Sequence, residues 1–225
     1  MIGNKKVLAV TLARGGSKKI PRKNIIDING KPLLGYTTEV VQKSKYVDAH
    51  IVSTDDTEIS IVAQLCGASV HMRDPSLALD TTTSAAALLD VAKKHPDYDY
   101  VVEVMATNPL KTTEDLDNVI KKLYDTGADS VVSVVRIWDQ HPSRVKYIKD
   151  DKLMDFYPEI PESRRQDLTP AAYVRNGSIY ATTMKSFLEH KVRLGPDTRP
   201  HIMSEENTIN IDEPRDLELA RILLK

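Results

Sequence analysis

Short apolar runs alternate with amphipathic stretches along most of the chain, and this alternation limits what the chain can fold into. The runs that predict strands are Val7 to Ala13, His50 to Ser53, Ser69 to Met72, Tyr100 to Met105 and Ser130 to Val135. Helical patterns between them fall near residues 33–44, 56–66, 83–95 and 113–126. Because a repeated strand-to-helix order requires crossover connections, we predict an α/β fold, doubly wound, with a mostly parallel sheet and helices on both of its faces.

A polar stretch with several prolines interrupts this order from about residue 136 to residue 173. The alternation then resumes with a strand over Ser178 to Thr182, a short helix around Met184 to His190, a strand near His201 to Met203 and a helix after Asp212. We therefore expect a single domain over residues 1–225, in which residues 136–173 form a small inserted arm.

Composition and charge exclude several classes of partner. With 225 residues, of which 41% are hydrophobic and 28% charged, the chain is long enough for one substantial core. The 31 basic and 32 acidic residues give a net charge of −1, which predicts no broad contact with nucleic acid or an anionic membrane. No run approaches the ~18 apolar residues that span a bilayer. The first residues lack the apolar segment of a signal peptide, and the single cysteine permits no internal disulfide, so we expect a cytoplasmic protein.

The stretch from Leu12 to Asn24 reads L-A-R-G-G-S-K-K-I-P-R-K-N and directly follows the first expected strand. Gly15 and Gly16 let the backbone approach an anion closely, Ser17 offers a hydroxyl, and the neighbouring cations neutralise several phosphoryl charges. The spacing fits neither the P-loop pattern G-x-x-x-x-G-K-[ST] nor the dinucleotide-binding pattern G-x-G-x-x-G, which argues against a P-loop kinase and a Rossmann dinucleotide enzyme. We predict a phosphate-binding loop at the end of a strand. The alternative, a solvated basic turn, explains neither the position after a strand nor the paired glycines.

Six further motifs follow this loop in order along the chain. They are V-S-T-D-D at 52–56, R-D-P-S-L-A-L-D at 73–80, A-T-N-P-L at 106–110, R-R-Q-D at 164–167, N-G-S-I-Y at 176–180 and I-N-I-D at 209–212. Together with the loop they resemble the cytidylyltransferases that activate sialic acids, the CMP-N-acylneuraminate synthetase family. The resemblance implies a nucleotidyltransferase-type fold and an enzyme that joins CTP to a nine-carbon acidic sugar, a nonulosonic acid, with release of pyrophosphate.

The resemblance also implies which residues bind the nucleotide. It places the triphosphate against Arg14, Lys18 and Lys23, with the backbone amides of Gly15, Gly16 and Ser17 as a cradle. Arg14, Lys23 and Asp212 are the expected catalytic residues, because the reaction depends on positioning and on neutralising phosphate charge. Further nucleotide-binding residues are expected to be Ala13, Asn24, Arg73 and Ser84. Several positions also have a purely structural alternative. Asn24 fits a turn residue, and one hydroxyl of residues 81–84 fits a helix cap. Asp55 and Asp56 fit a cap for the helix near residue 56.

A second set of residues is expected to bind the acceptor sugar. The resemblance assigns this role to Met105, Thr107, Asn108, Arg165, Gln166, Asn176 and Tyr180. The alternatives are that Arg165 only covers the arm and that Tyr180 is a core aromatic. Relatives often have L-Q-P-T-S-P-L-R where this chain has V-M-A-T-N-P-L-K. This departure favours an acceptor other than the commonest sialic acid, such as a legionaminic-type acid, and Arg175 is a candidate contact.

The chain departs most from the family's pattern at the motif expected to bind the metal. Relatives commonly have D-I-D where this chain has Asn210-Ile211-Asp212. Residues 210 and 212 share a face of an extended segment, so both fit one Mg²⁺, with Asn210 ligating through its carbonyl oxygen. The alternative is that Asp212 only caps the following helix.

Two other functions stay open alongside the main prediction. One is a cytidylyltransferase for 3-deoxy-octulosonate, and the other is an inactive nucleotide-binding regulator, suggested by Asn210 and Met105. The aromatic residues of the arm, Trp138, Phe156 and Tyr157, together with the resemblance, predict a homodimer that pairs through residues 136–173.

Overall fold

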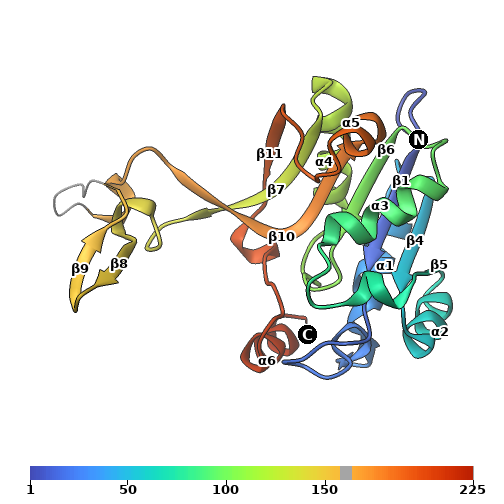
Figure 1. Cartoon of the computed structure of the whole chain (residues 1–225), viewed down its shortest axis with the longest axis horizontal. Helices are drawn as coiled ribbons and strands as arrows, with labels where there is room; N and C mark the ends of the chain where they lie inside the picture. The colour runs from blue at the N-terminus through green and yellow to red at the C-terminus, as the bar shows by residue number, and fades with distance from the viewer. Residues whose placement is uncertain (158–163, 225) are drawn as a thin grey trace.

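The chain folds around a seven-stranded sheet, in a computed structural model that describes residues 1–157 and 164–224 (Figure 1). Its strands are β1 (Val7–Leu12), β4 (Ala49–Thr54), β5 (Ser69–Met72), β6 (Tyr100–Val104), β7 (Ser130–Ile137), β10 (Ala172–Thr183) and β11 (Thr198–Ile202). The helices are α1 (Leu33–Gln42), α2 (Thr57–Leu65), α3 (Ser84–Lys94), α4 (Thr113–Thr126), α5 (Met184–His190) and α6 (Pro214–Leu223). The strand order is β11-β7-β10-β6-β1-β4-β5. The predicted α/β fold is thereby confirmed.

The sheet is mostly parallel, as predicted, with β10 as the exception. β1 pairs in parallel with β4 and β6, and β11 pairs in parallel with β7, whereas β10 runs antiparallel to both of its neighbours. The β1 run V-L-A-V-T-L is apolar without alternation because both faces of this central strand are covered: Val7 and Leu8 point to opposite sides and both are fully buried.

Helices cover both faces of the sheet, and the two cores between them are continuous with the strands. On one side, α1 and α4 pack Val41 and Leu116 against Val102 of β6. On the other side, α3 packs Leu88 against Leu8. α6 packs on the segment that follows the first loop, with Leu217 and Ala220 in one cluster with buried residues 20, 28 and 33. This last contact brings the C-terminal part of the chain beside the loop after β1.

The expected helix caps are present. The side chain of Asp56 caps α2 by accepting the N–H of Ile59 at 2.9 Å, and Thr83 caps α3 by accepting the N–H of Ala86 at 3.2 Å. The prediction that Asp56 caps a helix is therefore confirmed, as is the prediction that a hydroxyl within residues 81–84 does so.

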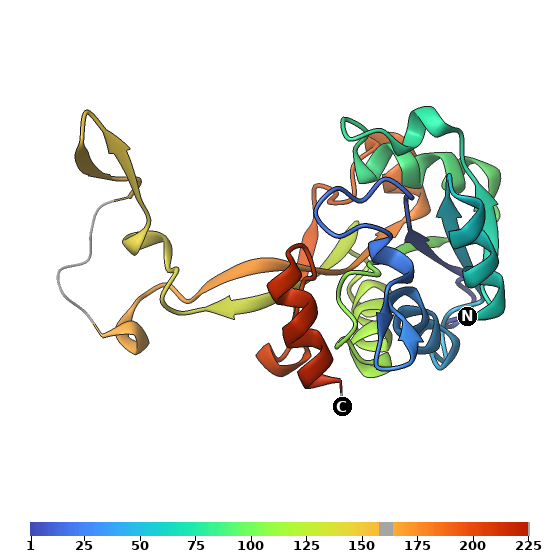
Figure 2. The same ribbon diagram turned by 90° about the horizontal axis from the view of Figure 1, so that it is seen from below.

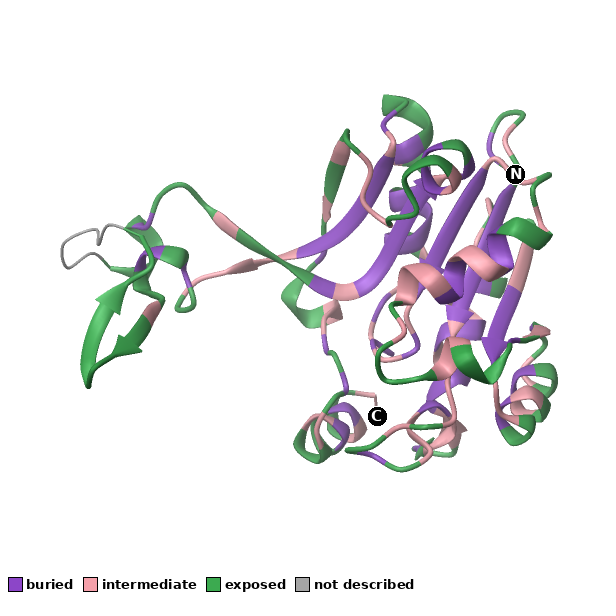
Figure 3. Ribbon diagram, in the orientation of Figure 1, coloured by how far each residue is buried: buried purple, intermediate pink, exposed green. Residues whose placement is uncertain are grey.

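An arm projects from the body of the molecule (Figure 2). The far ends of β7 and β10 pair with each other beyond the sheet, and a hairpin of β8 (Lys146–Lys149) and β9 (Lys152–Asp155) lies at the tip. The arm is mostly exposed, in contrast to the buried strands of the sheet (Figure 3), and Phe156 and Tyr157 are 58% and 61% exposed. Pro158 and Pro161, which belong to the expected arm, lie outside the described residues.

Several elements were not predicted from the sequence. A two-stranded hairpin of β2 (Asp27–Ile28) and β3 (Lys31–Pro32) precedes α1, and β10 begins at Ala172 rather than at the predicted Ser178. The first half of β10 is a strand because β7 supplies its hydrogen-bonding partner, which the local sequence does not reveal. None of the helices in residues 1–157 and 164–224 combines the length and apolar character needed to cross a bilayer.

Candidate active site

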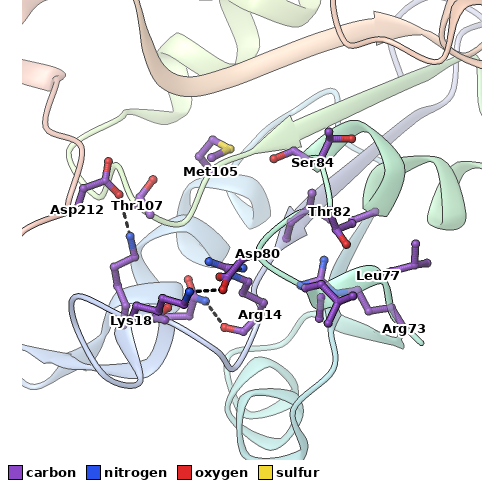
Figure 4. A pocket seen from close by; sticks show the side chains of 18 of the residues that line it. Arg14, Lys18, Arg73, Leu77, Asp80, Thr82, Ser84, Met105, Thr107 and Asp212 are labelled. Carbon is purple, nitrogen blue, oxygen red and sulfur yellow. Dashed lines mark hydrogen bonds and ion pairs between the residues drawn. The ribbon is translucent and has the colours of Figure 1, made fainter. Parts of the chain in front are cut away.

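A cleft of about 580 Å³ opens where β1, β5 and β6 end, which is the predicted place for a ligand in a parallel sheet. Its walls come from the loop after β1, the segment leading into α3, the end of β6 and the segment before α6 (Figure 4). The predicted site residues that line it are Arg14, Ser17, Lys18, Lys23, Asn24, Arg73, Ser84, Met105, Thr107 and Asp212. The fold thus brings residues from four separate motifs, together with Ser84 and Met105, into one cleft.

The loop after β1 is held by two neighbouring carboxylates at the end of β4. Asp55 accepts the N–H of Gly15 at 3.1 Å, and Asp56 accepts two hydrogen bonds from Arg22 at 2.5 and 3.0 Å. A side chain at Gly15 would place its Cβ 2.7 Å from Oδ2 of Asp56, so this position requires glycine for close packing. Asn24 ties the other end of the loop, since its Nδ2 donates to the carbonyl of Arg14 at 2.9 Å.

Two of the three amides of the predicted cradle already have partners inside the protein. The N–H of Gly15 is bonded to Asp55, and the N–H of Ser17 is bonded to the carbonyl of Gly15 at 3.0 Å. Ala13, Gly15 and Gly16 do not line the cleft, and Ala13 is buried in a core cluster with Leu34. The glycines therefore shape the loop, and the cationic side chains face the cleft.

The cations of the loop are paired with carboxylates across the cleft. Nη1 of Arg14 lies 2.9 Å from Oδ1 of Asp80, and Lys18 pairs with the other oxygen of the same carboxylate (Figure 4). Lys23 donates to Asp212 at 2.9 Å and to the carbonyl of Ile211 at 2.8 Å. The Lys18 ammonium and the Arg14 guanidinium lower the pKa of Asp80 below its ordinary value. Phosphate oxygens that enter the cleft therefore compete with these carboxylates for the same cations.

Three buried polar atoms of the cleft have no hydrogen-bond partner among the described residues. They are Nε of Arg73, Oε1 of Glu103 and Oγ1 of Thr107, and all three residues line the cleft. Arg73 is only 6% exposed, and its burial lowers the pKa of its guanidinium. Buried polar atoms are almost always hydrogen-bonded in folded proteins. Nε of Arg73 can donate to a ligand in the cleft, and Oε1 of Glu103 can accept from one.

A second hollow of about 350 Å³ contains several of the predicted sugar-binding residues. Its lining residues include Arg175, Asn176, Tyr180, Arg193 and Asn210. Tyr180 stands opposite Glu103 in the ladder between β10 and β6. Arg193 donates from Nη1 to Oε2 of Glu103 at 2.7 Å, and its guanidinium carbon lies 4.2 Å from the centre of the Tyr180 ring.

Glu103 and Arg193 are site residues that the sequence reasoning missed. Glu103 interrupts the apolar run V-V-E-V, and its side chain is 0% exposed. A carboxylate in the middle of a buried strand is rare without a partner. The acidic residue within this apolar run could therefore have identified Glu103 from the sequence. Arg193 follows α5 in a segment with no recognisable motif, so only the fold reveals it as the partner.

The predicted sugar-binding residues lie in different parts of the structure. Met105 and Thr107 line the main cleft, and Asn176 and Tyr180 line the second hollow. The Asn176 amide also accepts from Oγ of Ser133 at 2.7 Å, so part of its hydrogen-bonding capacity is used inside the fold.

Asn108 corrects the prediction made for it. The residue is 0% exposed and lines neither cavity, and its Oδ1 accepts the N–H of Leu110 at 3.2 Å. Its side chain therefore shapes the loop after β6 and does not face the acceptor.

Arg165 and Gln166 lie on the arm, in a short 3-10 helix η4 (Arg165–Asp167). Nη1 of Arg165 is 3.7 Å from Oδ2 of Asp139, and Arg165 lines a third hollow together with Trp138 and Glu205. A single chain does not bring these two residues to the main cleft, so their sugar-binding role stays a prediction.

Lys111 supports the loop that carries Met105 and Thr107. Its buried ammonium donates to the carbonyl of Met105 at 2.7 Å, to the carbonyl of Asn108 at 2.5 Å and to Oγ1 of Thr37 at 2.7 Å. Burial lowers the pKa of Lys111 to about 7. One side chain thus fixes both ends of the loop.

The predicted metal ligands lie side by side at the edge of the cleft. Nδ2 of Asn210 donates to Oδ2 of Asp212 at 2.5 Å, and Oδ1 of Asp212 accepts from Lys23. The Asp212 side chain does not cap α6, because Glu213 and Asp216 form that capping box. No group of three or more His, Cys, Asp or Glu side chains suited to a metal occurs in residues 1–157 and 164–224. The amide nitrogen of Asn210 faces Asp212 in this arrangement, so a Mg²⁺ held by both residues requires the amide to turn its carbonyl oxygen toward the ion, with water and phosphate oxygens as the other ligands.

Solved structures with this fold identify its class. One is a CMP:2-keto-3-deoxy-manno-octonic acid synthetase complexed with CTP, with a TM-score of 0.75 and 21% identity over 97% of this chain and 98% of that chain. Another is a 4-diphosphocytidyl-2C-methyl-D-erythritol synthase from Anaerococcus prevotii, with a TM-score of 0.72 and 18% identity over 98% of this chain and 96% of that chain. The fold is the α/β nucleotidyltransferase fold.

The sequence places the chain within that class. The model of the family described as Cytidylyltransferase matches residues 8–224, and the chain belongs to this cytidylyltransferase family. The predicted resemblance is therefore confirmed.

Three curated relatives are 30–34% identical to the chain over the aligned residues. It is 34% identical to a pseudaminic acid cytidylyltransferase of Campylobacter jejuni, over 98% of this chain and 97% of that protein. It is 30% identical to a CMP-N,N'-diacetyllegionaminic acid synthase of Legionella pneumophila, over 98% of this chain and 97% of that protein. It is 31% identical to N-acylneuraminate cytidylyltransferase B of Danio rerio, over 97% of this chain and 51% of that protein, so it spans about half of the fish protein's length.

Proposed function

We propose that this cytidylyltransferase joins CTP to a nonulosonic acid of the pseudaminic, legionaminic or sialic type, giving the CMP-sugar and pyrophosphate. The observation that carries the proposal is the cleft at the strand ends, where Arg14, Lys18, Lys23 and Arg73 converge on a space that also contains unpartnered polar atoms. The names of the relatives from Campylobacter jejuni, Legionella pneumophila and Danio rerio support the same class of acceptor.

In the proposed reaction the anomeric hydroxyl of the acid attacks the α-phosphorus of CTP, and pyrophosphate leaves with the bridging oxygen. Arg14 and Lys18 exchange Asp80 for phosphate oxygens, and Lys23 holds the phosphates from the opposite side. The side chains of Arg73, Asn24 and Ser84 orient the nucleoside part. Catalysis then comes from fixing the two reactants in line and from neutralising the charge that develops on the phosphates.

Asp212, together with Asn210 once its amide turns the carbonyl oxygen toward the ion, is proposed to hold a Mg²⁺ ion. Such an ion, when bound, neutralises phosphate charge and keeps the leaving pyrophosphate oriented. Because Asn210 replaces a carboxylate with an amide, the site has one formal negative charge fewer than a pair of aspartates would give. We expect Asn210→Asp to lower the Mg²⁺ concentration needed for half-maximal rate, as measured by titration of the metal at saturating CTP.

We also propose that the protein works as a cytoplasmic homodimer. The arm exposes apolar side chains at its tip, including Ile148 at 76%, Leu153 at 71% and Phe156 at 58%. A second copy of the chain would cover them. Light scattering at micromolar concentration tests this pairing, with Ile148→Asp as the variant expected to give monomers. A monomeric wild-type chain would contradict it.

The experiment that tests the proposed activity is pyrophosphate release. The purified protein is mixed with Mg²⁺ and CTP, and with pseudaminic acid, legionaminic acid, N-acetylneuraminic acid or 3-deoxy-octulosonate in turn. The same reactions are repeated with ATP, GTP and UTP. Release that requires CTP and one nonulosonic acid supports the proposal. Release only with 3-deoxy-octulosonate would change the acceptor, and CTP binding without release in any reaction would favour a nucleotide-binding regulator.

A further inference from the structure

Glu103 is a fully buried carboxylate that the nucleotide chemistry described above does not use. It lies in the middle of β6 and lines the main cleft. Its Oε2 accepts from Arg193, whereas its Oε1 has no partner among the described residues. Burial raises the pKa of this carboxyl, and the Arg193 guanidinium acts in the opposite direction. A charged oxygen left unpaired in the core costs free energy, so a donor from a ligand is the natural partner for it.

Arg193 is fixed in place by three contacts. It pairs with Glu103, its guanidinium lies over the Tyr180 ring at 4.2 Å, and its carbonyl accepts from Oγ1 of Thr182 at 2.7 Å. Its side chain is 23% exposed and lines the second hollow, whereas Glu103 lines the main cleft. The pair therefore lies where the two cavities meet. Arg193 uses one of its five N–H groups on Glu103 and can donate others into the hollow.

The charge of this pair indicates what kind of group it recognises. Glu103 cancels the charge of Arg193, so the pair is poorly suited to the carboxylate of the acceptor and well suited to a neutral polar group. An apolar surface lies beside it, because Met105 and Leu194 pack with Val132, Val134 and Tyr180. A neutral substituent with an N–H or O–H, an adjacent oxygen and an apolar portion matches this combination.

We propose that Glu103 and Arg193 select the acceptor by binding a neutral polar substituent of the sugar acid, with an N–H or O–H donated to Oε1 of Glu103 and an oxygen of the substituent accepting from Arg193. This inference rests on the proposed function and deepens it by naming acceptor-selecting residues. An acid that lacks the donor leaves Oε1 of Glu103 without a hydrogen-bond partner in the complex. Such an acid is rejected, because a buried polar group without a partner strongly disfavours the analogue that leaves it so.

The test uses a double variant that keeps the charge balance. Glu103→Leu with Arg193→Leu removes both charges together, which avoids the unpaired buried charge that either single change would leave. Glu103→Gln keeps the size of the side chain but has one acceptor oxygen in place of two, so it cannot accept from both Arg193 and the substituent. The control is Lys121→Ala with Asp125→Ala, an exposed ion pair on α4 outside both cavities. Kinetics with the best acceptor, and equilibrium binding of CTP alone, are measured for all four proteins.

For the double variant we expect kcat/KM for the acceptor to fall about 10- to 100-fold, the range of one hydrogen bond to a charged group. We expect the Kd for CTP alone to change less than about twofold, because the pair acts on the acceptor. Glu103→Gln should lower kcat/KM for the acceptor as well, because its one oxygen pairs with Arg193 and its NH2 faces the donor of the substituent. Preference for the best acceptor over 3-deoxy-octulosonate should fall in parallel.

Two results would overturn the inference while leaving the proposed function intact. One is an unchanged kcat/KM for the acceptor in the double variant, and the other is an equal weakening of CTP and acceptor. If the wild-type enzyme releases pyrophosphate with no acid at all, the proposed function fails, and the inference fails with it. The wild-type reaction therefore separates the two failures.

Discussion

The two sides of the cleft are built in different ways. The side proposed to bind the nucleotide, the nucleotide side, comes mostly from one contiguous stretch, residues 12–24, to which Arg73 and Ser84 are added. The side proposed to bind the acceptor, the acceptor side, comes from β6, β10, the segment after α5 and the segment before α6, none of which is adjacent in sequence. A contiguous motif can be recognised before the fold is known. A dispersed site can be recognised only once the sheet has brought its parts together.

The electrostatics of the two sides differ as well. On the nucleotide side, Arg14 and Lys18 are partly exposed and pair with Asp80, a carboxylate that a phosphate can replace. On the acceptor side, Glu103 and Arg193 pair inside the protein and leave one oxygen unpartnered. The first arrangement suits a polyanion, and the second suits a neutral group with a hydrogen to donate.

The largest effect is expected on the nucleotide side, from Arg14→Ala. Removing one preorganised cation from a phosphoryl-transfer site should reduce turnover about 10²- to 10³-fold. The side chain is 36% exposed and its ion pair is with the partly exposed Asp80, so thermal unfolding should change little. Pyrophosphate release and a melting curve measure both quantities, with Lys45→Ala, an exposed cation outside the cleft, as the control. Unchanged turnover would remove Arg14 from the catalytic residues.

Lys111→Met tests whether the acceptor side depends on one buried cation. The substitution leaves the carbonyls of Met105 and Asn108 without their ammonium donor. We expect the free energy of unfolding to fall by about 2–4 kcal/mol, because hydrogen bonds to a charged donor are lost inside the core. Urea unfolding measures the change, and Lys121→Met on the exposed face of α4 is the matched control. A loss no larger than the control's would show that the loop holds its shape without Lys111.

Gly15→Ala tests how closely the nucleotide loop packs on Asp56. The new Cβ would lie 2.7 Å from Oδ2 and 3.0 Å from Cβ of Asp56, so the loop must shift. We expect a loss of about 1–3 kcal/mol in stability, typical of overpacking, together with weaker CTP binding. Gly16→Ala is the matched control, since its Cβ would meet nothing within 4 Å. Equal effects of the two substitutions would contradict the proposed packing.

The stability of the protein should depend on pH through two buried basic groups, Lys111 and His50. Burial lowers the pKa of Lys111 from 10.5 to about 7, and burial together with the charge of Lys111 lowers the pKa of His50 from 6.5 to about 4. For each group, at a pH between its pKa in the folded protein and its pKa in the unfolded chain, the unfolded chain binds more protons than the folded protein. Stability should therefore rise with pH from about 4 to 6.5 through His50, and from about 7 to 10.5 through Lys111.

Each group contributes a slope of at most about 1.4 kcal/mol per pH unit. Urea unfolding between pH 5 and pH 10 measures it in the wild-type protein and in Lys111→Met. The variant should lose the slope between about pH 7 and 10.5 and keep most of the slope between about pH 4 and 6.5, because burial is the larger cause of the lowered His50 pKa and the charge of Lys111 the smaller. A slope between about pH 7 and 10.5 that survives in Lys111→Met would assign the titration to another group.

The smallest effect is expected from Asp80→Asn. The substitution removes the carboxylate that competes with phosphate for Arg14 and Lys18. Because exposed ion pairs are weak, CTP should bind only about two- to fivefold more tightly. Calorimetric titration with CTP at two salt concentrations measures this gain, which should shrink as salt screens the pairs. Weaker binding would instead show that Asp80 positions the cations rather than competing for them.

Much of the fold could be predicted because its signals are local. The runs that became β5 and α5 match the predicted limits, and the buried strands β1 and β6 end within one residue of them. The first half of β10 could not be predicted, because its strand partner lies some 40 positions away in β7. One amide of the predicted cradle has a partner that the local sequence does not reveal, because Asp55 accepts the Gly15 N–H from a different strand end.

The candidate site shows the same limit. Arg14, Lys23 and Asp212 were found from their motifs, and the structure brings all three to one cleft. Asn108 was misassigned because a motif does not tell which way an amide side chain faces, and Asn108 faces the interior. Arg193 lies outside every motif and becomes visible only as the partner of Glu103.

The course of β10 links the arm to the acceptor hollow. The pairing of β10 with β7 changes register between Arg175 and Tyr180, and Gly177, with a φ of 63°, lies at that change and lines the hollow. One continuous strand therefore carries the arm and also forms a wall of the hollow, and Asn176 is fixed at this point by hydrogen bonds to Ser133 and Thr208. The arm and the hollow are thus joined by paired backbone with no loop between them, so a substitution at this point of β10 affects both.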